Sequence, residues 1–136
     1  MTQNSCILSQ GFTSYMYMLL GDIGTPAGLT MECGFYSGGW RNGPNMYSLM
    51  ITDVWLNIIV TWNGTNLVQY VNGSLNATTP IPSTSVSSGL PHHIGGRWDA
   101  AAYMTGQIGE LRIYGIALTL SQVTTLYSQT ASAYTV

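Results

Sequence analysis

Short apolar runs alternate with breaks rich in glycine, proline and asparagine along most of the chain, a pattern typical of β-strands joined by turns. In Ser14–Leu20 (SYMYMLL) both sets of alternating positions are apolar, so we expect both faces of this strand to be covered. Ser37–Asn45 (SGGWRNGPN) is predicted to be a long loop. The predicted strands lie, in order, at Cys6–Leu8, Ser14–Leu20, Leu29–Tyr36, Val54–Thr78 (three strands), His92–Gly95 and Met104–Tyr114.

The stretch Val54–Thr78 carries the sharpest turn signals of the chain. Asn63-Gly64 and Asn72-Gly73 each join two runs of strand-forming residues. An Asn-Gly pair favours a type I′ hairpin turn, because this turn needs positive φ at both central residues. The first turn would then place Trp62 opposite Thr65. We therefore expect a three-stranded antiparallel meander whose register is set by its turns.

One helix is expected near the end of the chain. Thr119 and Gln122 have the spacing of a capping box, in which each side chain meets the backbone N–H of the other residue. Leu118 and Val123 occupy the positions of a hydrophobic staple. Val123, Leu126 and Tyr127 give the predicted helix one apolar stripe.

Three motifs in this order carry a family resemblance. They are WLNIIVTWNGTNLVQYVNG at Trp55–Gly73, the Ile-Gly strand at His93–Gly95, and GQIGELRIYGIAL at Gly106–Leu118, which leads into the capped helix. With this order the chain resembles the laminin-G-like branch of the concanavalin A-like lectin/glucanase superfamily. The resemblance implies one all-β domain over residues 1–136, an antiparallel two-sheet jelly-roll sandwich with one short C-terminal helix.

The chain departs from the family at its beginning. Domains of this family usually open with one or two strands before the position that Cys6 takes here. A sandwich without an outer strand has an unpaired edge, which natural proteins cover or blunt. We therefore expect another chain to lie against the first strand, Cys6–Gln10.

Composition excludes two classes of partner. Charged residues make up 6% of the chain, and its basic residues are Arg41, Arg97 and Arg112. Nucleic-acid binding needs clustered basic residues, so nucleic acid is excluded as a partner. No run of about 18 apolar residues is present to span a membrane. Met1–Gln10 has neither the basic start nor the apolar run of a signal peptide.

The low charge also bears on assembly. A formal net charge of −2 gives little repulsion between copies of the chain. Contact with other protein subunits, in a homo- or hetero-oligomer, is therefore one reading. The other reading is that surface β-proteins are often rich in neutral polar residues. Cys6 and Cys33 lie on separate predicted strands, where they can remain thiols or form a disulfide.

The superfamily includes glucanases, but the carboxylates of this chain do not suit catalysis. Glycoside hydrolysis generally uses two carboxyl groups about 5 to 10 Å apart. The hydrolase branch carries them in a Glu-x-Asp-x-Glu run, which this chain lacks, and Glu32 and Glu110 are isolated. Glu110 is expected to pair with Arg112 on the same face of a strand. The sequence thus predicts a protein that is not an enzyme.

The sequence gives only weak support for a metal site. His92 and His93 are adjacent on a strand and should point to opposite faces, one inward and one outward, so they cannot share an ion. Calcium is the one cofactor that the resemblance suggests, held by loop aspartates at Asp22, Asp53 and Asp99. The alternative is that these aspartates cap turns.

Two tryptophans suggest a binding surface. Trp40 lies beside Arg41 and Trp98 beside Arg97, both in glycine-rich segments. Indole rings stack on sugar rings and arginine donates to hydroxyls, so these residues are candidates for glycan binding. The alternative is that they pack the ends of the sandwich or contact another subunit.

Two functions follow from these observations. The main prediction is a structural or display subunit of a phage or virus particle, of the capsid-decoration or fibre-head type, with glycan binding as an additional property. The alternative is a carbohydrate-binding adhesion module of a surface or secreted protein. Both place the chain on a virion surface or outside the cell.

Overall fold

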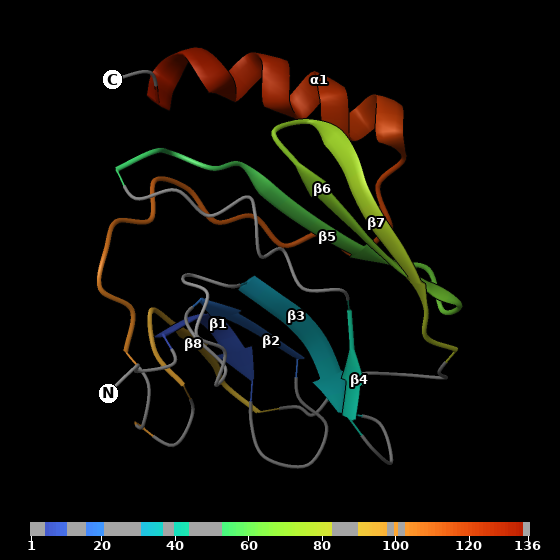
Figure 1. The fold of residues 1–136 in the computed structure, drawn as a ribbon, viewed down its shortest axis with the longest axis vertical. Coiled ribbons are helices and arrows are strands. Elements are labelled where there is room, and N and C mark those ends of the chain that lie inside the picture. The colour runs from blue at the N-terminus through green and yellow to red at the C-terminus, as the bar shows by residue number, and fades with distance from the viewer. Residues whose placement is uncertain are drawn as a thin grey trace. The chain divides into compact units, whose positions relative to one another are not determined.

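The computed structural model describes residues 5–10, 16–20, 31–36, 40–43, 53–82, 90–97, 100 and 103–134. These residues form two antiparallel β-sheets and one α-helix, followed by one turn of 3-10 helix (Figure 1). The elements are β1 (Ser5–Gln10), β2 (Met16–Leu20), β3 (Met31–Tyr36), β4 (Trp40–Asn42), β5 (Ile58–Trp62), β6 (Asn66–Val71), β7 (Ser74–Pro80), β8 (His92–Ile94), α1 (Leu120–Thr130) and η1 (Ala131–Tyr134).

The fold class predicted from the sequence is confirmed: the chain is mostly β, with two antiparallel sheets and one short C-terminal helix. The chain forms two compact units. The first unit contains Met1–Ile51 and Ser83–Gly106, and the second contains Thr52–Pro82 and Gln107–Val136. The two units are described separately below, and a single domain over residues 1–136 stays a prediction.

The sheet of the first unit has the strand order β4-β3-β2-β1-β8. Strand β1 lies inside this sheet, because Leu8 is paired with Met18 of β2 on one side and with Ile94 of β8 on the other. The expectation that β1 forms an open edge covered by another chain is therefore wrong. The distant residues 92–94 of the same chain fill that position, a long-range pairing that local sequence does not reveal. The edges of this sheet are β4 and β8.

Buried side chains of the first unit centre on β1 and β3. Cys6, Leu8 and Cys33 are all at most 5% exposed. No disulfide joins the two cysteines, although both are buried. Two polar side chains of β1, Ser9 and Gln10, are also buried, and both donate hydrogen bonds to backbone carbonyls. Such bonds offset the cost of removing polar groups from water.

The predicted loop Ser37–Asn45 contains a strand, which corrects the sequence-based prediction. Strand β4 turns back along β3 and pairs Trp40 with Tyr36. The pairing continues past the strand, since the N–H of Gly43 donates to the carbonyl of Cys33 at 2.8 Å. The glycine-rich composition predicts a loop, but the free edge of β3 supplies partners that stabilise an extended backbone here.

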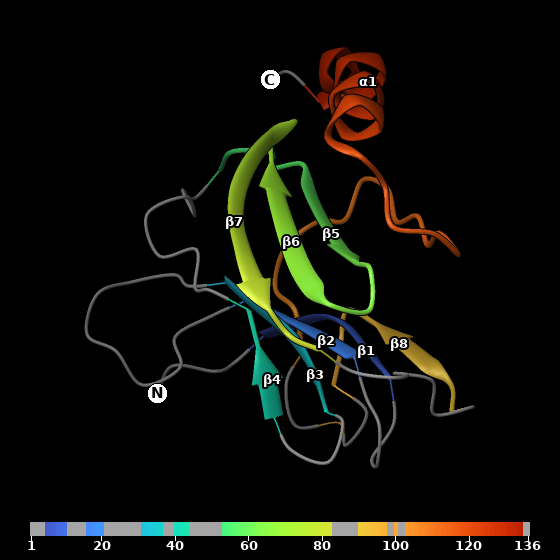
Figure 2. The ribbon, with the colours of Figure 1, turned by 90° about the vertical axis from the view of Figure 1, so that its right-hand side faces the viewer.

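The second unit contains the predicted meander, with strand order β5-β6-β7 (Figure 2). Its second turn has the predicted form, because Asn72 and Gly73 have φ of 49° and 76° and Val71 pairs with Ser74. Both central residues therefore have positive φ, as a type I′ turn requires.

The first turn of the meander differs from the prediction. Trp62 pairs with Leu67 rather than with Thr65, so the register moves by two residues. Here Gly64 has φ of 91°, whereas Asn63 does not have positive φ. The Asn63 side-chain oxygen instead accepts the backbone N–H groups of Thr65 and Asn66, at 3.0 and 2.8 Å. This Asx-type bonding makes Asn63 the residue before the turn. A two-residue shift leaves every side chain on its predicted face.

Helix α1 begins as predicted. The Thr119 hydroxyl accepts from the N–H of Gln122, whose side chain accepts from the N–H of Thr119. Leu118 and Val123 are buried with Tyr70 of β6 in one cluster. The β6–β7 turn lies against the helix, since the Thr124 hydroxyl donates to the carbonyl of Gly73 at 3.2 Å (Figure 1). The helix thus packs on the meander through its predicted apolar stripe.

The predicted strand Met104–Tyr114 is wrong. Residues 104–119 contain no strand, and Figure 1 draws them without an arrow. Their alternating pattern is suited to a strand, but a strand also needs a neighbouring edge with which to exchange backbone hydrogen bonds. The strands observed in the second unit are paired only with one another.

Candidate functional site

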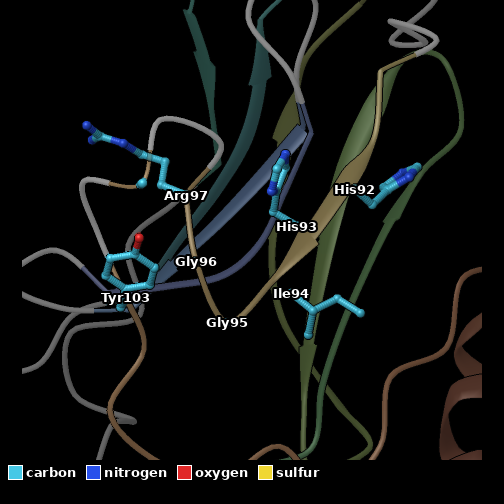
Figure 3. A pocket seen from close by; sticks show the side chains of 8 residues that line it. His92, His93, Ile94, Gly95, Gly96, Arg97 and Tyr103 are labelled. Carbon is cyan, nitrogen blue, oxygen red and sulfur yellow. The ribbon is translucent and has the colours of Figure 1, made fainter.

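The first unit has a shallow depression beside strand β8. Its volume is about 430 Å³, within the range of small-ligand sites. Residues 92–97 line it together with Ala100 and Tyr103 (Figure 3). All of these residues come from β8 and the loop that follows it, so one continuous stretch of chain forms the site.

Hydrogen bonds to β1 hold β8 in place at both ends. Before β8, the Gln10 side chain donates to the carbonyl of Leu90 at 3.0 Å. After β8, the Ser9 hydroxyl donates to the carbonyl of Gly96 at 3.1 Å, and the N–H of Gly95 donates to the carbonyl of Ile7 at 2.8 Å. The two buried polar side chains of β1 therefore position the strand that forms the depression.

The loop after β8 is closed by backbone bonds of its own. The N–H of Met104 donates to the carbonyl of Gly95 at 2.9 Å, and Gly96 forms a β-bridge with Tyr103. Within the loop, the N–H of Ala100 donates to the carbonyl of Arg97 at 3.0 Å. This closure presents the ring of Tyr103, which is 63% exposed, at the rim of the depression.

The side chains of β8 point to two sides. Figure 3 shows His93 on the side of β8 where Arg97 and Tyr103 lie, whereas His92 and Ile94 point to the other side. This confirms that the two histidines face opposite ways. The expectation that one of them points inward is wrong, because both are exposed.

The depression combines an aromatic face with hydrogen-bond donors. Tyr103 supplies an exposed ring, and Arg97 and His93 supply nitrogen donors on the same side of β8. The glycines at positions 95 and 96 place no side chain in the space between them. A flat, hydroxyl-rich molecule such as a sugar ring can stack on the tyrosine and accept hydrogen bonds from these donors.

The structure separates the arginines that the sequence singled out. Arg97 lines the depression, but Arg41 is exposed on β4, at the opposite edge of the same sheet. Three strands lie between these edges, so the two arginines are on the order of 19 Å apart across the sheet and belong to different surfaces. Trp40 lies on β4 beside Arg41. Trp98 falls outside the described residues.

The proposed calcium ligands are not brought together within the described residues. Asp53 is exposed and has φ of 62°, a conformation common for aspartate in turns. Asp22 and Asp99 lie outside the described residues. The part of the chain that the structure describes contains no cluster of three metal-binding side chains. Calcium binding through these aspartates stays a prediction.

Sequence reasoning missed two residues of the depression, His93 and Tyr103. The sequence favours a structural place in the sheet for His93, whereas the structure leaves its side chain exposed. Tyr103 has one signal in the sequence, since it is an aromatic residue in a loop, five residues after Trp98. That signal became informative only when the Gly96–Tyr103 bridge placed its ring beside β8.

Comparisons with known proteins identify a family. The model of the concanavalin A-like lectin/glucanases superfamily matches residues 2–124. A crystal structure of an S-layer domain-containing protein from Clostridium thermocellum is similar at 19% identity, with a TM-score of 0.41. The similarity covers 86% of this chain and 58% of that structure's chain. No curated protein matches the sequence. Among the described residues, no helix has the length and apolar character that a membrane crossing would need.

Proposed function

The chain belongs to the concanavalin A-like lectin/glucanase superfamily, and from this premise we propose that it is a non-catalytic carbohydrate-binding module. Its ligand is a saccharide that binds in the depression beside β8. Family membership alone does not decide function, since one fold hosts many functions. The proposal therefore rests on the site.

One observation carries the proposal: the exposed ring of Tyr103 lies on the same side of β8 as Arg97 and His93 (Figure 3). The exposed ring of Tyr103 offers a flat face for stacking, and sugars present both apolar C–H faces and hydroxyls. The site is open and shallow, which suits the end of a glycan chain or one exposed sugar unit.

The carboxylates support a role without catalysis. The described residues that line the depression include no aspartate or glutamate, whereas glycoside hydrolysis generally needs two carboxyl groups about 5 to 10 Å apart. Glu110 is held in an ion pair with Arg112 at 2.7 Å. That contact gives Glu110 a structural partner rather than a substrate.

We place this module on a surface or secreted protein, as an adhesion domain. The comparisons with known proteins contain nothing that points to a phage or virus particle, which was the main prediction from the sequence. The adhesion role is therefore the better supported of the two. Partners of this kind are glycans or glycoproteins outside the cell.

A binding experiment tests the proposal. The protein is screened against a panel of immobilised oligosaccharides, and the best ligand is titrated in solution by calorimetry. Tyr103→Ala is expected to weaken binding about fivefold, because a stacking contact is worth on the order of 1 kcal/mol. The control is Leu75→Ala, which removes another large exposed side chain that lies outside the depression.

Two results would contradict the proposal. One is the absence of binding to every saccharide in the panel by the folded wild-type protein. The other is a Tyr103→Ala variant that binds as tightly as the wild type, which would place the ligand elsewhere on the surface.

A further inference from the structure

Segment 107–116 (QIGELRIYGI) is an exposed stretch with the composition of a strand. Its large apolar side chains are between 36% and 67% exposed: Ile108, Leu111, Ile113, Tyr114 and Ile116. Among the described residues, no backbone hydrogen bond joins this segment to another strand. An apolar stretch with unpaired backbone groups is a template for strand pairing.

The side chains indicate an extended backbone over residues 110–114, ahead of the bend at residues 115 and 116. Nε of Arg112 lies 2.7 Å from Oε1 of Glu110, and the Tyr114 side chain also hydrogen-bonds Arg112. The hydrogen bond that Arg112 donates to the Tyr114 side chain and the contact with Glu110 both raise the pKa of Arg112. Residues 110, 112 and 114 therefore share one side, which is the two-residue repeat of a β-strand. The segment needs little rearrangement to pair with a partner.

The sequence of the segment is complementary to itself. In an antiparallel pair centred on Leu111, each residue faces the one equally far on the other side of Leu111. Glu110 then faces Arg112 of a second copy, and Ile108 faces Tyr114. Opposite charges and aromatic–β-branched pairs directly across an antiparallel ladder are both stabilising.

Neighbouring registers are unfavourable, so the pairing is specific. A shift by one residue moves every side chain of one strand to the other face. A shift by two would place Glu110 opposite Glu110, or Arg112 opposite Arg112, and like charges directly opposite destabilise a sheet. The register centred on Leu111 is therefore the one that pairs opposite charges with each other and apolar side chains with each other.

We propose that two copies of this chain associate through segment 107–116, in which residues 108–114 form a two-stranded antiparallel ribbon across a twofold axis at Leu111. The contact is isologous, since both copies use the same surface. The net charge of −2 leaves little repulsion between the copies. A ribbon of seven residues in each copy is small as an interface, so the dimer is weak and depends on concentration.

Charge reversal tests the pairing. In E110R both charged positions of the segment are arginines, and in R112E both are glutamates. Each variant alone would place like charges opposite one another, so we expect it to remain a 14.7 kDa monomer at concentrations where the wild type dimerises. An equimolar mixture of the two variants is expected to form a heterodimer, measured by sedimentation velocity.

The mixture separates this proposal from pairing within one chain. Each variant also loses the ion pair inside its own chain, and mixing cannot restore that pair. Heterodimer formation therefore reports contacts between chains. The proposal is overturned if the wild type is monomeric up to millimolar concentration, if either variant dimerises as well as the wild type, or if the mixture stays monomeric. Both altered residues are exposed, and circular dichroism checks that each variant is folded.

A cross-linking experiment tests the position of the axis. In L111C, the new cysteines of two copies would lie directly opposite one another, with Cα atoms about 4.5 to 5.5 Å apart, which suits a disulfide. The matched control is I113C, whose counterpart on the second copy would lie about 13 Å away. Under mild oxidation L111C is expected to give a covalent dimer and I113C a monomer. Equal cross-linking of both variants, or of neither, would contradict the proposed register.

Discussion

Strand β6 and segment 107–116 have similar strand patterns and opposite environments. In β6, Leu67 and Tyr70 are at most 6% exposed, and the strand lies between β5 and β7. In segment 107–116, Leu111 and Tyr114 are 36% and 44% exposed, and no strand lies beside them among the described residues. Both stretches consist of strand-forming residues, so composition does not account for the difference.

The difference lies in the turns at the ends of the two stretches. A tight turn precedes β6 at Asn63 and another follows it at Asn72-Gly73, so each neighbouring strand is adjacent in the sequence. Segment 107–116 is followed by the capped start of α1, which brings no strand back along it. A turn makes pairing local and inexpensive in entropy, whereas a strand without one depends on a distant partner.

The largest expected effect comes from truncating matched leucines in the two regions. Leu67→Ala should lower the free energy of unfolding by about 3 kcal/mol, because the side chain is 3% exposed and its removal leaves a cavity. Leu111→Ala should cost less than about 1 kcal/mol in dilute solution, because that side chain is already partly in water. Urea denaturation of both variants measures the contrast. Equal losses would mean that segment 107–116 is packed as firmly as β6.

A smaller effect is expected from the turn after β6. Gly73→Ala should lower the free energy of unfolding by about 2 kcal/mol, because φ is 76° and a Cβ atom would lie 2.7 Å from the ring of Tyr127. Gly64→Ala is the control, since φ is 91° there but no atom lies within 4 Å of the added Cβ. It should cost about 1 kcal/mol, from backbone strain alone. Thermal or urea unfolding measures the stability of the two variants. Equal losses of stability would show that the clash with Tyr127 does not contribute to the cost of Gly73→Ala.

The same division between local and distant contacts decides what the sequence could predict. The Asn72-Gly73 turn and the Thr119–Gln122 capping box depend on residues within three positions of each other, and both were predicted correctly. The predicted register of the first turn was wrong by two residues. The Asn63 side chain accepts hydrogen bonds from the backbone that follows it, so Asn63 precedes the turn instead of occupying its centre. Strand β4 was missed because its partner edge, on β3, outweighs its loop-like composition.

The candidate site follows this rule. Arg97 was singled out because it lies beside a loop tryptophan, which is a local signal. His93 and Tyr103 join it only through the long-range pairing of β8 with β1 and through the bridge that closes the loop. The sequence around His93 and Tyr103 does not predict either of these contacts.

Amide hydrogen exchange across a series of protein concentrations tests the central claim most directly, which is that segment 107–116 pairs with the same segment of a second copy. We expect the amides of β6 to be protected at every concentration, and those of residues 108–115 to exchange fast in dilute samples and to become protected as the concentration rises. Protection of residues 108–115 that does not change with concentration would contradict the claim, because their partner would then belong to the same chain. Fast exchange at every concentration would contradict it as well.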